Sequence, residues 1–142
     1  MTAASDFLEN KVLDHVLRYS TAPYVAPTTL YLALFVNTSG NAATNLEAGT
    51  LTDEIPTAGS TAYARKAITF AAASSGTSTS SATVTFDTAT ASWGTVTHVA
   101  IVDSATRAAG NVLFYGAVTT SKTIDTGDTF QVTSGNLTIS LA

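Results

Sequence analysis

The sequence predicts a mainly β protein, with a single β-sandwich or barrel-like domain of about seven antiparallel strands and one N-terminal amphipathic helix. Only residues 5–18 show the apolar spacing of a helix. From residue 30 onward, β-branched and aromatic residues recur in short runs that are separated by Gly, Ser, Asn and Asp. This succession of short runs and turn residues is typical of sandwiches and barrels.

The predicted helix spans residues 5–18. Its apolar residues fall on one face: Leu8, Val12, Leu13, Val16 and Leu17. Ser5 or Asp6 can cap the first turn, and Arg18 in the last turn suits the negative end of the helix dipole. Because the opposite face is polar, we expect the helix to lie on the surface of the domain, after a short N-terminal arm at residues 1–4.

Seven apolar runs predict the strands: residues 30–36, 64–70, 82–86, 96–102, 112–118, 129–133 and 137–141. The first run is almost wholly apolar, so we expect a strand that is buried on both sides or lies with one face under the helix. The last two runs alternate apolar and hydroxyl residues on either side of a Ser-Gly-Asn turn at 134–136. They predict a hairpin with one apolar and one hydroxyl face.

Residues 37–62 show no sustained period and carry many turn residues. A loop of this length in a compact domain is uncommon and is usually functional or mobile. We expect it either to contact a partner or to be a flexible excursion, and the same two interpretations hold for a second loop at 71–81. The strand-rich portion covers residues 63–142. A chain of this size can bury one good core, so we expect one domain over residues 1–142.

The chain is poor in charge for its size. Six Lys and Arg and ten Asp and Glu make up 11% of the residues, against roughly 25% in a typical soluble domain, whereas 27 Thr and 14 Ser supply many hydroxyl groups. Either these hydroxyl groups keep the surface wet or part of the surface faces other subunits. The net charge of −4 and the lack of a basic stripe argue against nucleic acid and an anionic membrane as main partners.

The chain contains no Cys, so it has no disulfide framework and no thiol nucleophile. Its first residues lack the basic start and the apolar core of a signal peptide. Its apolar runs are far shorter than a membrane span requires. We therefore expect a protein that is made in the cytoplasm without a signal peptide.

The sequence offers little catalytic chemistry. Its two His residues are His15 on the predicted helix and His98, which shares a predicted strand face with Val96, Ala100 and Val102. A His on an apolar strand face is usually a packing residue. The chain carries no helical H-E-x-x-H motif, no Asp-rich calcium loop and no glycine-rich phosphate loop. We predict no catalytic residue, no cofactor and no metal, and therefore no enzyme.

Five aromatic residues are candidates for a sugar-binding platform: Tyr19, Tyr24, Tyr63, Trp93 and Tyr115. Most of them flank strands or face apolar neighbours, so core or seam positions are the favoured interpretation. A structural or binding role is therefore favoured over catalysis.

Six strings stand out in the sequence: LENKVLDHVL at 8–17, YLALF at 31–35, YAR at 63–65, SWGTVTH at 92–98, LFYGA at 113–117 and TSKTI at 120–124. Together, and in this order, they resemble a widespread family of small tailed-phage virion proteins. The resemblance covers nearly the whole chain. Members are commonly labelled tail fibre proteins, and similar small β proteins serve as capsid cement, or decoration, proteins.

The resemblance implies a non-enzymatic virion structural protein. The main expectation is a capsid cement protein that binds the outer surface of the assembled shell and clamps neighbouring capsomers, because a compact chain without a shaft pattern suits a joint between subunits. Its partner would be the major capsid protein, its location the capsid surface of the virion, and self-association as a trimer is expected. The alternative is a tail fibre or tail-tip module that binds a host glycan or a tail protein.

Nine residues are candidates for partner contacts: Glu9, Lys11, Asp14, Asn45, Glu47, Asp53, Glu54, Arg65 and Lys66. The first three lie on the predicted helix and the next four in the long loop, and the two basic residues could form salt bridges with an acidic shell. The N-terminal segment at 1–5 and the loop from Thr38 to Gly59 are candidates as well. The alternative for all of them is ordinary solvated surface.

Overall fold

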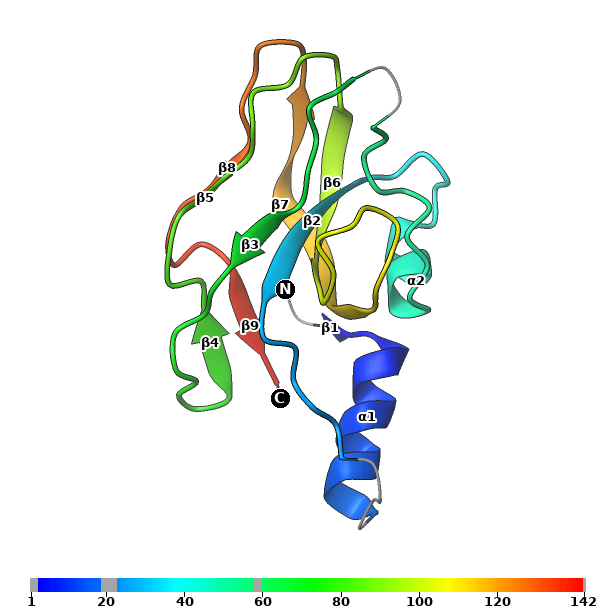
Figure 1. Ribbon diagram of the computed structural model, residues 1–142, viewed down its shortest axis with the longest axis vertical. Helices are drawn as coiled ribbons and strands as arrows, with labels where there is room; N and C mark the ends of the chain where they lie inside the picture. The colour runs from blue at the N-terminus through cyan, green and yellow to red at the C-terminus, as the bar shows by residue number, and fades with distance from the viewer. Residues whose placement is uncertain (1–2, 19–22, 58–59, 142) are drawn as a thin grey trace.

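The computed structural model describes residues 3–18, 23–57 and 60–141, and Figure 1 shows the arrangement of its strands and helices. In chain order the elements are β1 (Ala3–Ala4), α1 (Asp6–Leu17), β2 (Leu30–Val36), α2 (Ala42–Glu47), β3 (Lys66–Ile68), β4 (Thr77–Thr79), β5 (Val84–Thr85), β6 (Gly94–Val102), β7 (Val112–Ile124), β8 (Gln131–Val132) and β9 (Thr138–Ser140). The protein is mainly β with an N-terminal helix, which confirms the predicted fold class.

The main sheet has five strands in the order β1-β7-β6-β2-β3, and all of its neighbouring strands are antiparallel. Two further pairs, β4-β9 and β5-β8, form separate two-stranded sheets. The main hydrophobic cluster joins these layers, since it combines Leu34 and Ile101 of the main sheet with Ile139 of β9 and with Phe86, which follows β5. The described strands do not close into a barrel, so the sandwich interpretation is the one that holds.

Strand β2 is buried on both sides, as its apolar sequence predicts. Leu32 and Leu34 point into the main cluster, whereas Ala33 and Phe35 point into a second cluster on the opposite face. That second face is covered by α2, which contributes Leu46, and not by the N-terminal helix. The helix α2 lies within the long loop at 37–62, where the sequence predicts no regular element.

The prediction of a C-terminal hairpin is wrong. The turn at 134–136 exists, because the Asn136 amide donates to the Thr133 carbonyl at 3.1 Å. However, β8 pairs with β5 and β9 pairs with β4 (Figure 1), so the chain from 131 to 140 runs as one kinked strand along residues 77–85. The buried Ser80 hydroxyl accepts from the amides of Gly135 and Leu137, which fits the kink against its partner strand.

The predicted position of His98 on one strand face with Val96 is wrong, because β6 contains a β-bulge. The register of β6 shifts between Val96 and His98, so that Val96 joins the main cluster while Ala100 and Val102 lie in the second cluster. An extra residue in one strand reverses the face of every side chain before it. His98 therefore does not share a face with Val96, and burial lowers the pKa of its half-buried ring.

Strand β7 is longer than predicted and runs on to Ile124. Its extension is rich in hydroxyl groups and pairs with the start of β6, where Thr95 lies opposite Thr123. The short strands β1 and β4 lie in segments for which the sequence predicts no strand, namely the N-terminal arm and the loop at 71–81.

The start of α1 is set by Ser5, which is fully buried. Its hydroxyl accepts from the Leu8 amide at 3.4 Å, as an N-cap does, and donates to the Val112 carbonyl. Its own amide donates to the Leu113 carbonyl at 3.0 Å. Of the two predicted caps, Ser5 is thus the one used, and it attaches the helix to the start of β7.

Ser5→Ala tests this attachment. It removes both hydroxyl contacts, and loss of an N-cap costs about 1 kcal/mol of stability. We expect a lower free energy of unfolding in urea and faster amide exchange across α1. The control is Ser121→Ala on the exposed part of β7, which should change neither. Equal exchange rates in α1 for Ser5→Ala and the wild type would contradict the role of Ser5.

Candidate interaction surface

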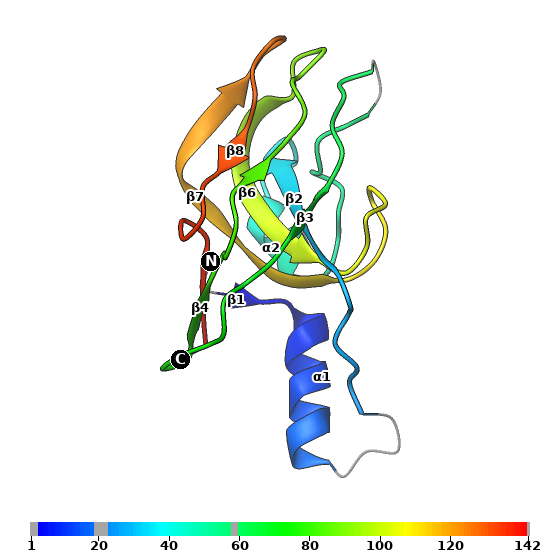
Figure 2. The ribbon, with the colours of Figure 1, turned by 60° about the vertical axis from the view of Figure 1, so that its left-hand side comes forward.

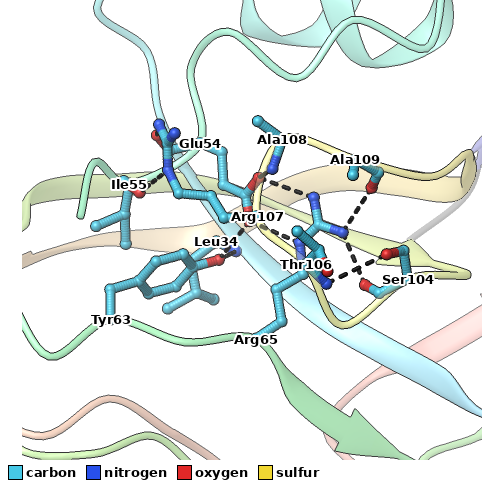
Figure 3. Close-up of polar contacts among 10 residues, drawn as sticks. All are labelled: Leu34, Glu54, Ile55, Tyr63, Arg65, Ser104, Thr106, Arg107, Ala108 and Ala109. Atoms are coloured by element: carbon cyan, nitrogen blue, oxygen red, sulfur yellow. Dashed lines mark hydrogen bonds and ion pairs between the residues drawn. The ribbon is translucent and has the colours of Figure 1, made fainter.

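Two of the nine candidate residues, Glu54 and Arg65, form a buried ion pair (Figure 3). Arg65 Nε lies 2.7 Å from Glu54 Oε1, Arg65 Nη2 lies 2.8 Å from Glu54 Oε2, and both side chains are completely buried. Arg65 Nη1 also donates to the carbonyls of Ser104 and Ala109, at 2.7 and 2.8 Å. The pair therefore ties three separate segments of the chain together.

The Glu54 carboxylate accepts further hydrogen bonds. The Tyr63 hydroxyl donates to Oε1 at 3.0 Å and accepts from the Leu34 amide, while the Ala108 amide donates to Oε2 at 2.8 Å. Arg107 Nη2 donates to the Glu54 carbonyl at 2.9 Å. Burial, and then the Glu54 charge, raise the pKa of Tyr63 far above its ordinary value. In the described part of the chain, no buried side-chain nitrogen or oxygen lacks a hydrogen-bond partner.

Asp53 organises the long loop in the same internal way. Its side chain accepts from the Thr38 hydroxyl, from the Ser39 amide and hydroxyl, and from Asn45 Nδ2, at distances of 2.5 to 3.2 Å. Burial acts to raise the pKa of Asp53, but these hydrogen bonds outweigh it and the pKa is lowered. The part of the loop between residues 37 and 53 is therefore an ordered structure that holds α2.

The remaining loop and strand candidates also have internal partners. Glu47 accepts from the Tyr115 hydroxyl at 2.8 Å, and burial together with this carboxylate raises the pKa of Tyr115 to about 12. Lys66 Nζ lies 2.7 Å from Asp87 Oδ2, in a pair that stays partly exposed. Each of these side chains keeps some access to solvent, so contact with a partner stays a prediction for them.

The three helix candidates do not share one face. Glu9 lines a groove beside the helix. Lys11 Nζ lies over the Phe7 ring, 5.8 Å from its centroid, and Asp14 pairs with Arg18 at 3.1 Å. Residues two positions apart on a helix point in different directions, which explains the separation of Glu9 from Lys11.

The structure thus narrows the predicted contact set. Asp53, Glu54 and Arg65 are between 1% and 6% exposed, so their side chains do not form surface. Partner contact stays a prediction for the other six residues: Glu9, Lys11, Asp14, Asn45, Glu47 and Lys66. In the predicted N-terminal segment, Ala3 and Ala4 form β1 and Ser5 is buried, whereas residues 1–2 lie outside the described chain, as does Gly59 at the end of the predicted loop contact.

The aromatic candidates for a sugar platform are mostly internal. Trp93 is 2% exposed, packs edge-on to Tyr63 with ring centroids 5.5 Å apart, and donates through Nε1 to the Thr61 carbonyl. Tyr63 and Tyr115 are also buried. Tyr19 lies outside the described residues, and Tyr24 packs edge-on to Phe7. The preference for core or seam positions is confirmed for Tyr63, Trp93 and Tyr115.

The apolar face of α1 carries four of the six large hydrophobic residues that are exposed in the described chain. Only Leu8 of the apolar stripe is buried, whereas Val12, Leu13, Val16 and Leu17 are 43%, 54%, 71% and 73% exposed. Figure 2 shows the helix extending away from the sheets, with its exposed tip farthest from them. A contiguous apolar patch of this kind marks an interaction surface.

A groove of about 730 Å³ lies at the base of this helix. We call it the α1 groove. Its lining residues are Leu8, Glu9, Val12 and Leu13 of α1, Ala3 and Ala4 of β1, Tyr24, Ala26, Pro27 and Leu30, Leu113 and Phe114 at the start of β7, and Ser140 and Leu141. The sequence contains the stripe, but the groove depends on segments that are far apart in the chain. Stripe and groove are continuous, because Val12 and Leu13 belong to both.

The described residues hold no group of three or more His, Cys, Asp or Glu side chains able to bind a metal ion. None of the described helices is both long and apolar enough to cross a membrane.

Comparison with known proteins gives one family. The family model described as "Podophage GP4 fiber I protein gp80" matches residues 3–140 of the chain. The search of curated proteins found no match to the chain.

The buried and the exposed ion pairs can be compared through two neighbouring residues. Arg65→Met leaves the Glu54 carboxylate buried without its cation, which costs about 3–5 kcal/mol. Lys66→Met removes a partly exposed cation, which costs at most about 1 kcal/mol. Urea denaturation should therefore show a large loss of stability for Arg65→Met and a small one for Lys66→Met. Similar losses for the two variants would contradict the structural role of the buried pair.

Asp53→Asn should change how stability depends on pH. The folded state lowers the pKa of Asp53, so its carboxylate stabilises the protein above the unfolded pKa of about 3.9, and this contribution is lost as the pH falls through the folded pKa. The variant lacks this contribution. We expect wild type to be clearly more stable near neutral pH, with the difference shrinking below about pH 4. A difference in stability between the two proteins that stays constant with pH, measured by urea denaturation, would contradict this role of the Asp53 carboxylate.

Proposed function

The chain belongs to the Gp80 family of podophage fiber proteins, which are phage virion structural proteins, and we propose that it is a fibre module held in the tail by contacts of α1 and the α1 groove. The observation that carries this proposal is the exposed apolar stripe of α1, which continues into the groove. A protein that works within an assembly covers such a surface with a neighbouring subunit.

The energetics of α1 support an assembled state. A helix of 12 residues is marginal by itself in water, and most helical stability comes from packing of its apolar face. Here Leu8 alone is buried. Covering a Val or Leu side chain completely contributes roughly 1.5–3 kcal/mol, so a partner on the four exposed residues would stabilise the helix and the contact together.

The three sheets and the loops between them, which we call the β body, provide the base for this contact. The Glu54–Arg65 pair and its donors hold the long loop against the loop that follows β6, and Ser5 attaches α1 to β7. The low content of charge also favours association, since few charged groups would need to lose water on binding.

The family description supports the fibre interpretation, which the sequence gives as the alternative, better than the main expectation of a capsid cement protein. The described chain has no long helix or repeated shaft unit, so the role we propose is that of a compact module that joins other fibre or tail subunits. A tail protein is favoured over a host glycan as the partner, because Tyr63, Trp93 and Tyr115 are buried and offer no sugar platform.

The location can be tested on purified virions. A fibre module should be present in far fewer copies than the major capsid protein on a quantitative gel, and antibodies against it should label the tail. A copy number comparable with that of the major capsid protein, with label over the shell, would overturn the fibre proposal in favour of capsid decoration.

The role of α1 can be tested by virion incorporation. Leu17→Asp, at a residue that is 73% exposed, should leave folding intact but deplete the protein from particles. Val25→Asp is the matched control, because Val25 is 81% exposed and does not line the groove. Equal incorporation of the two variants would show that α1 is not the attachment surface.

A further inference from the structure

We propose that a second pocket of the protein, away from α1, binds a sugar ring that carries a carboxylate group. This pocket has a volume of about 570 Å³ and lies between the end of β2, the long loop, the start of β6 and the loop after β6. We call it the Arg107 pocket, after the only cation among its described lining residues. No described residue lines both this pocket and the α1 groove, so the two sites are separate.

The Arg107 pocket and α1 lie at opposite ends of the main sheet (Figure 1). Helix α1 joins the sheet through β1, which pairs with Phe114 and Tyr115 at the start of β7. The pocket is at the other end, where Val36 of β2 lies opposite Val96 near the start of β6. A ligand can therefore bind here while α1 is covered by a neighbouring tail subunit.

The Arg107 guanidinium is held in place with one nitrogen left over. Its Nε donates to the Ile55 carbonyl at 2.7 Å and its Nη2 to the Glu54 carbonyl at 2.9 Å (Figure 3). Among the described residues, Nη1 has no hydrogen-bond partner and no carboxylate lies within ion-pair distance of Arg107. Because the guanidinium is already oriented, it loses little conformational freedom when it binds an anion.

The carboxylates around the pocket leave the charge of Arg107 uncompensated. Glu54 is the only acidic residue in the described lining, and Arg65 neutralises it at 2.7 Å. The neighbouring Asp53 carboxylate accepts four hydrogen bonds from its own loop. A carboxylate on a ligand would give Arg107 the counter-charge that the chain does not supply, through a charge-assisted hydrogen bond.

Asn37 adds a second oriented donor to the lining. Its Oδ1 accepts from the Ala42 amide at 2.9 Å, which holds the side chain against the start of α2. Its Nδ2 makes no hydrogen bond to the described part of the chain. Guanidinium and carboxamide N–H groups both donate, so this pair of side chains suits a ligand that is rich in acceptors.

The rest of the lining suits a sugar ring better than a bare anion. The side chains of Thr52, Thr95 and Thr97 line the pocket, and their hydroxyl groups can donate and accept, as the hydroxyl groups of a sugar do. Val36 and Pro56 add apolar surface for the C–H groups of a ring. The volume lies within the range of small-molecule sites. This mode of recognition uses charge and hydroxyl groups and needs no exposed aromatic platform.

Backbone strain beside the pocket supports a ligand site. Ala108, which follows the pocket cation in the chain, has a φ of 56°. Ser60 and Ala62, with φ of 57° and 58°, flank Thr61, whose carbonyl accepts from Trp93 in the lining. A positive φ is uncommon outside Gly, and strained residues of this kind cluster at ligand sites. Three of the four in the described chain thus lie next to this pocket.

Nuclear magnetic resonance titration of the isolated full chain tests the ligand class. The probes are galacturonate and glucuronate, with galactose and glucose as their neutral counterparts and acetate as a carboxylate without a ring. At least one acidic sugar should shift the resonances of Asn37 and Gly94 in the pocket. It should bind about ten- to a hundredfold more tightly than its neutral counterpart, because a charged hydrogen bond is gained, and more tightly than acetate.

Three outcomes of this titration would overturn the proposal. They are the absence of shifts in the pocket with both acidic sugars, equal affinity for acidic and neutral sugars, and equal affinity for acetate and the acidic sugars. The last outcome would show that the pocket reads a carboxylate alone and not a sugar.

Asn37→Asp tests the pocket with little disturbance of the fold. The new side chain keeps an oxygen for the Ala42 amide but replaces the free donor by a negative charge, so the acidic sugar should bind at least about tenfold more weakly. Asn10→Asp makes the same change on the exposed surface of α1 and should bind as the wild type does. Unchanged affinity in a folded Asn37→Asp variant would exclude the pocket as the binding site.

Arg107→Gln tests the role of the charge. The variant should lose the preference for the acidic sugar over its neutral counterpart, whereas Lys122→Gln, at an exposed cation on β7, should keep it. If Arg107 served only to hold the Glu54 and Ile55 carbonyls, the variant would be less stable in urea but would retain the preference. That result would overturn the proposed role of Arg107.

The Arg107 pocket and the α1 surface can be tested independently. Leu17→Asp should bind the acidic sugar as the wild type does, and Asn37→Asp should enter virions normally. Loss of sugar binding in Leu17→Asp would overturn the separation of the two sites, whereas a failure of Leu17→Asp to affect incorporation would refute the attachment role of α1 and leave the sugar site standing.

Discussion

The buried ion pair between Glu54 and Arg65 is the interaction on which the β body depends. Removing two charges from water costs several kcal/mol for each, and the cost is offset only where every remaining polar group is satisfied. Here Tyr63, Ala108 and two loop carbonyls supply those partners. The loop after β6 closes tightly enough to do so because of Gly110, where a Cβ atom would lie 2.4 Å from an oxygen of Asp103.

Sequence patterns predict best those elements that a strong local signal specifies. The helix is predicted at 5–18 and is found at Asp6–Leu17. The first strand is predicted at 30–36 and is found at Leu30–Val36. Both have a periodicity or an apolar run that tertiary contacts do not override. The resemblance in six strings also leads to the correct kind of protein, a phage virion structural protein.

The features that the sequence does not reveal depend on contacts between distant residues. The Ser-Gly-Asn turn predicts a local reversal of the chain, but the pairing of β8 and β9 with other strands is set by the segment around Ser80. Charged residues are expected at the surface, so nothing in the sequence marks Glu54 and Arg65 as a buried pair. The α1 groove is likewise lined by residues from both ends of the chain, so no local sequence pattern predicts it.

The joint at Ser5 has a mechanical consequence for a protein that works in an assembly. At its N-terminal end, α1 is joined to the sheet by the two residues of β1, which lie opposite Tyr115 and Phe114, and by the hydrogen bonds of Ser5 to the start of β7. These bonds are few and lie at one edge of the sheet, whereas the β body is cross-linked by its internal network. A pull on this end of α1 therefore loads a small number of hydrogen bonds at one sheet edge, and not the Glu54–Arg65 network.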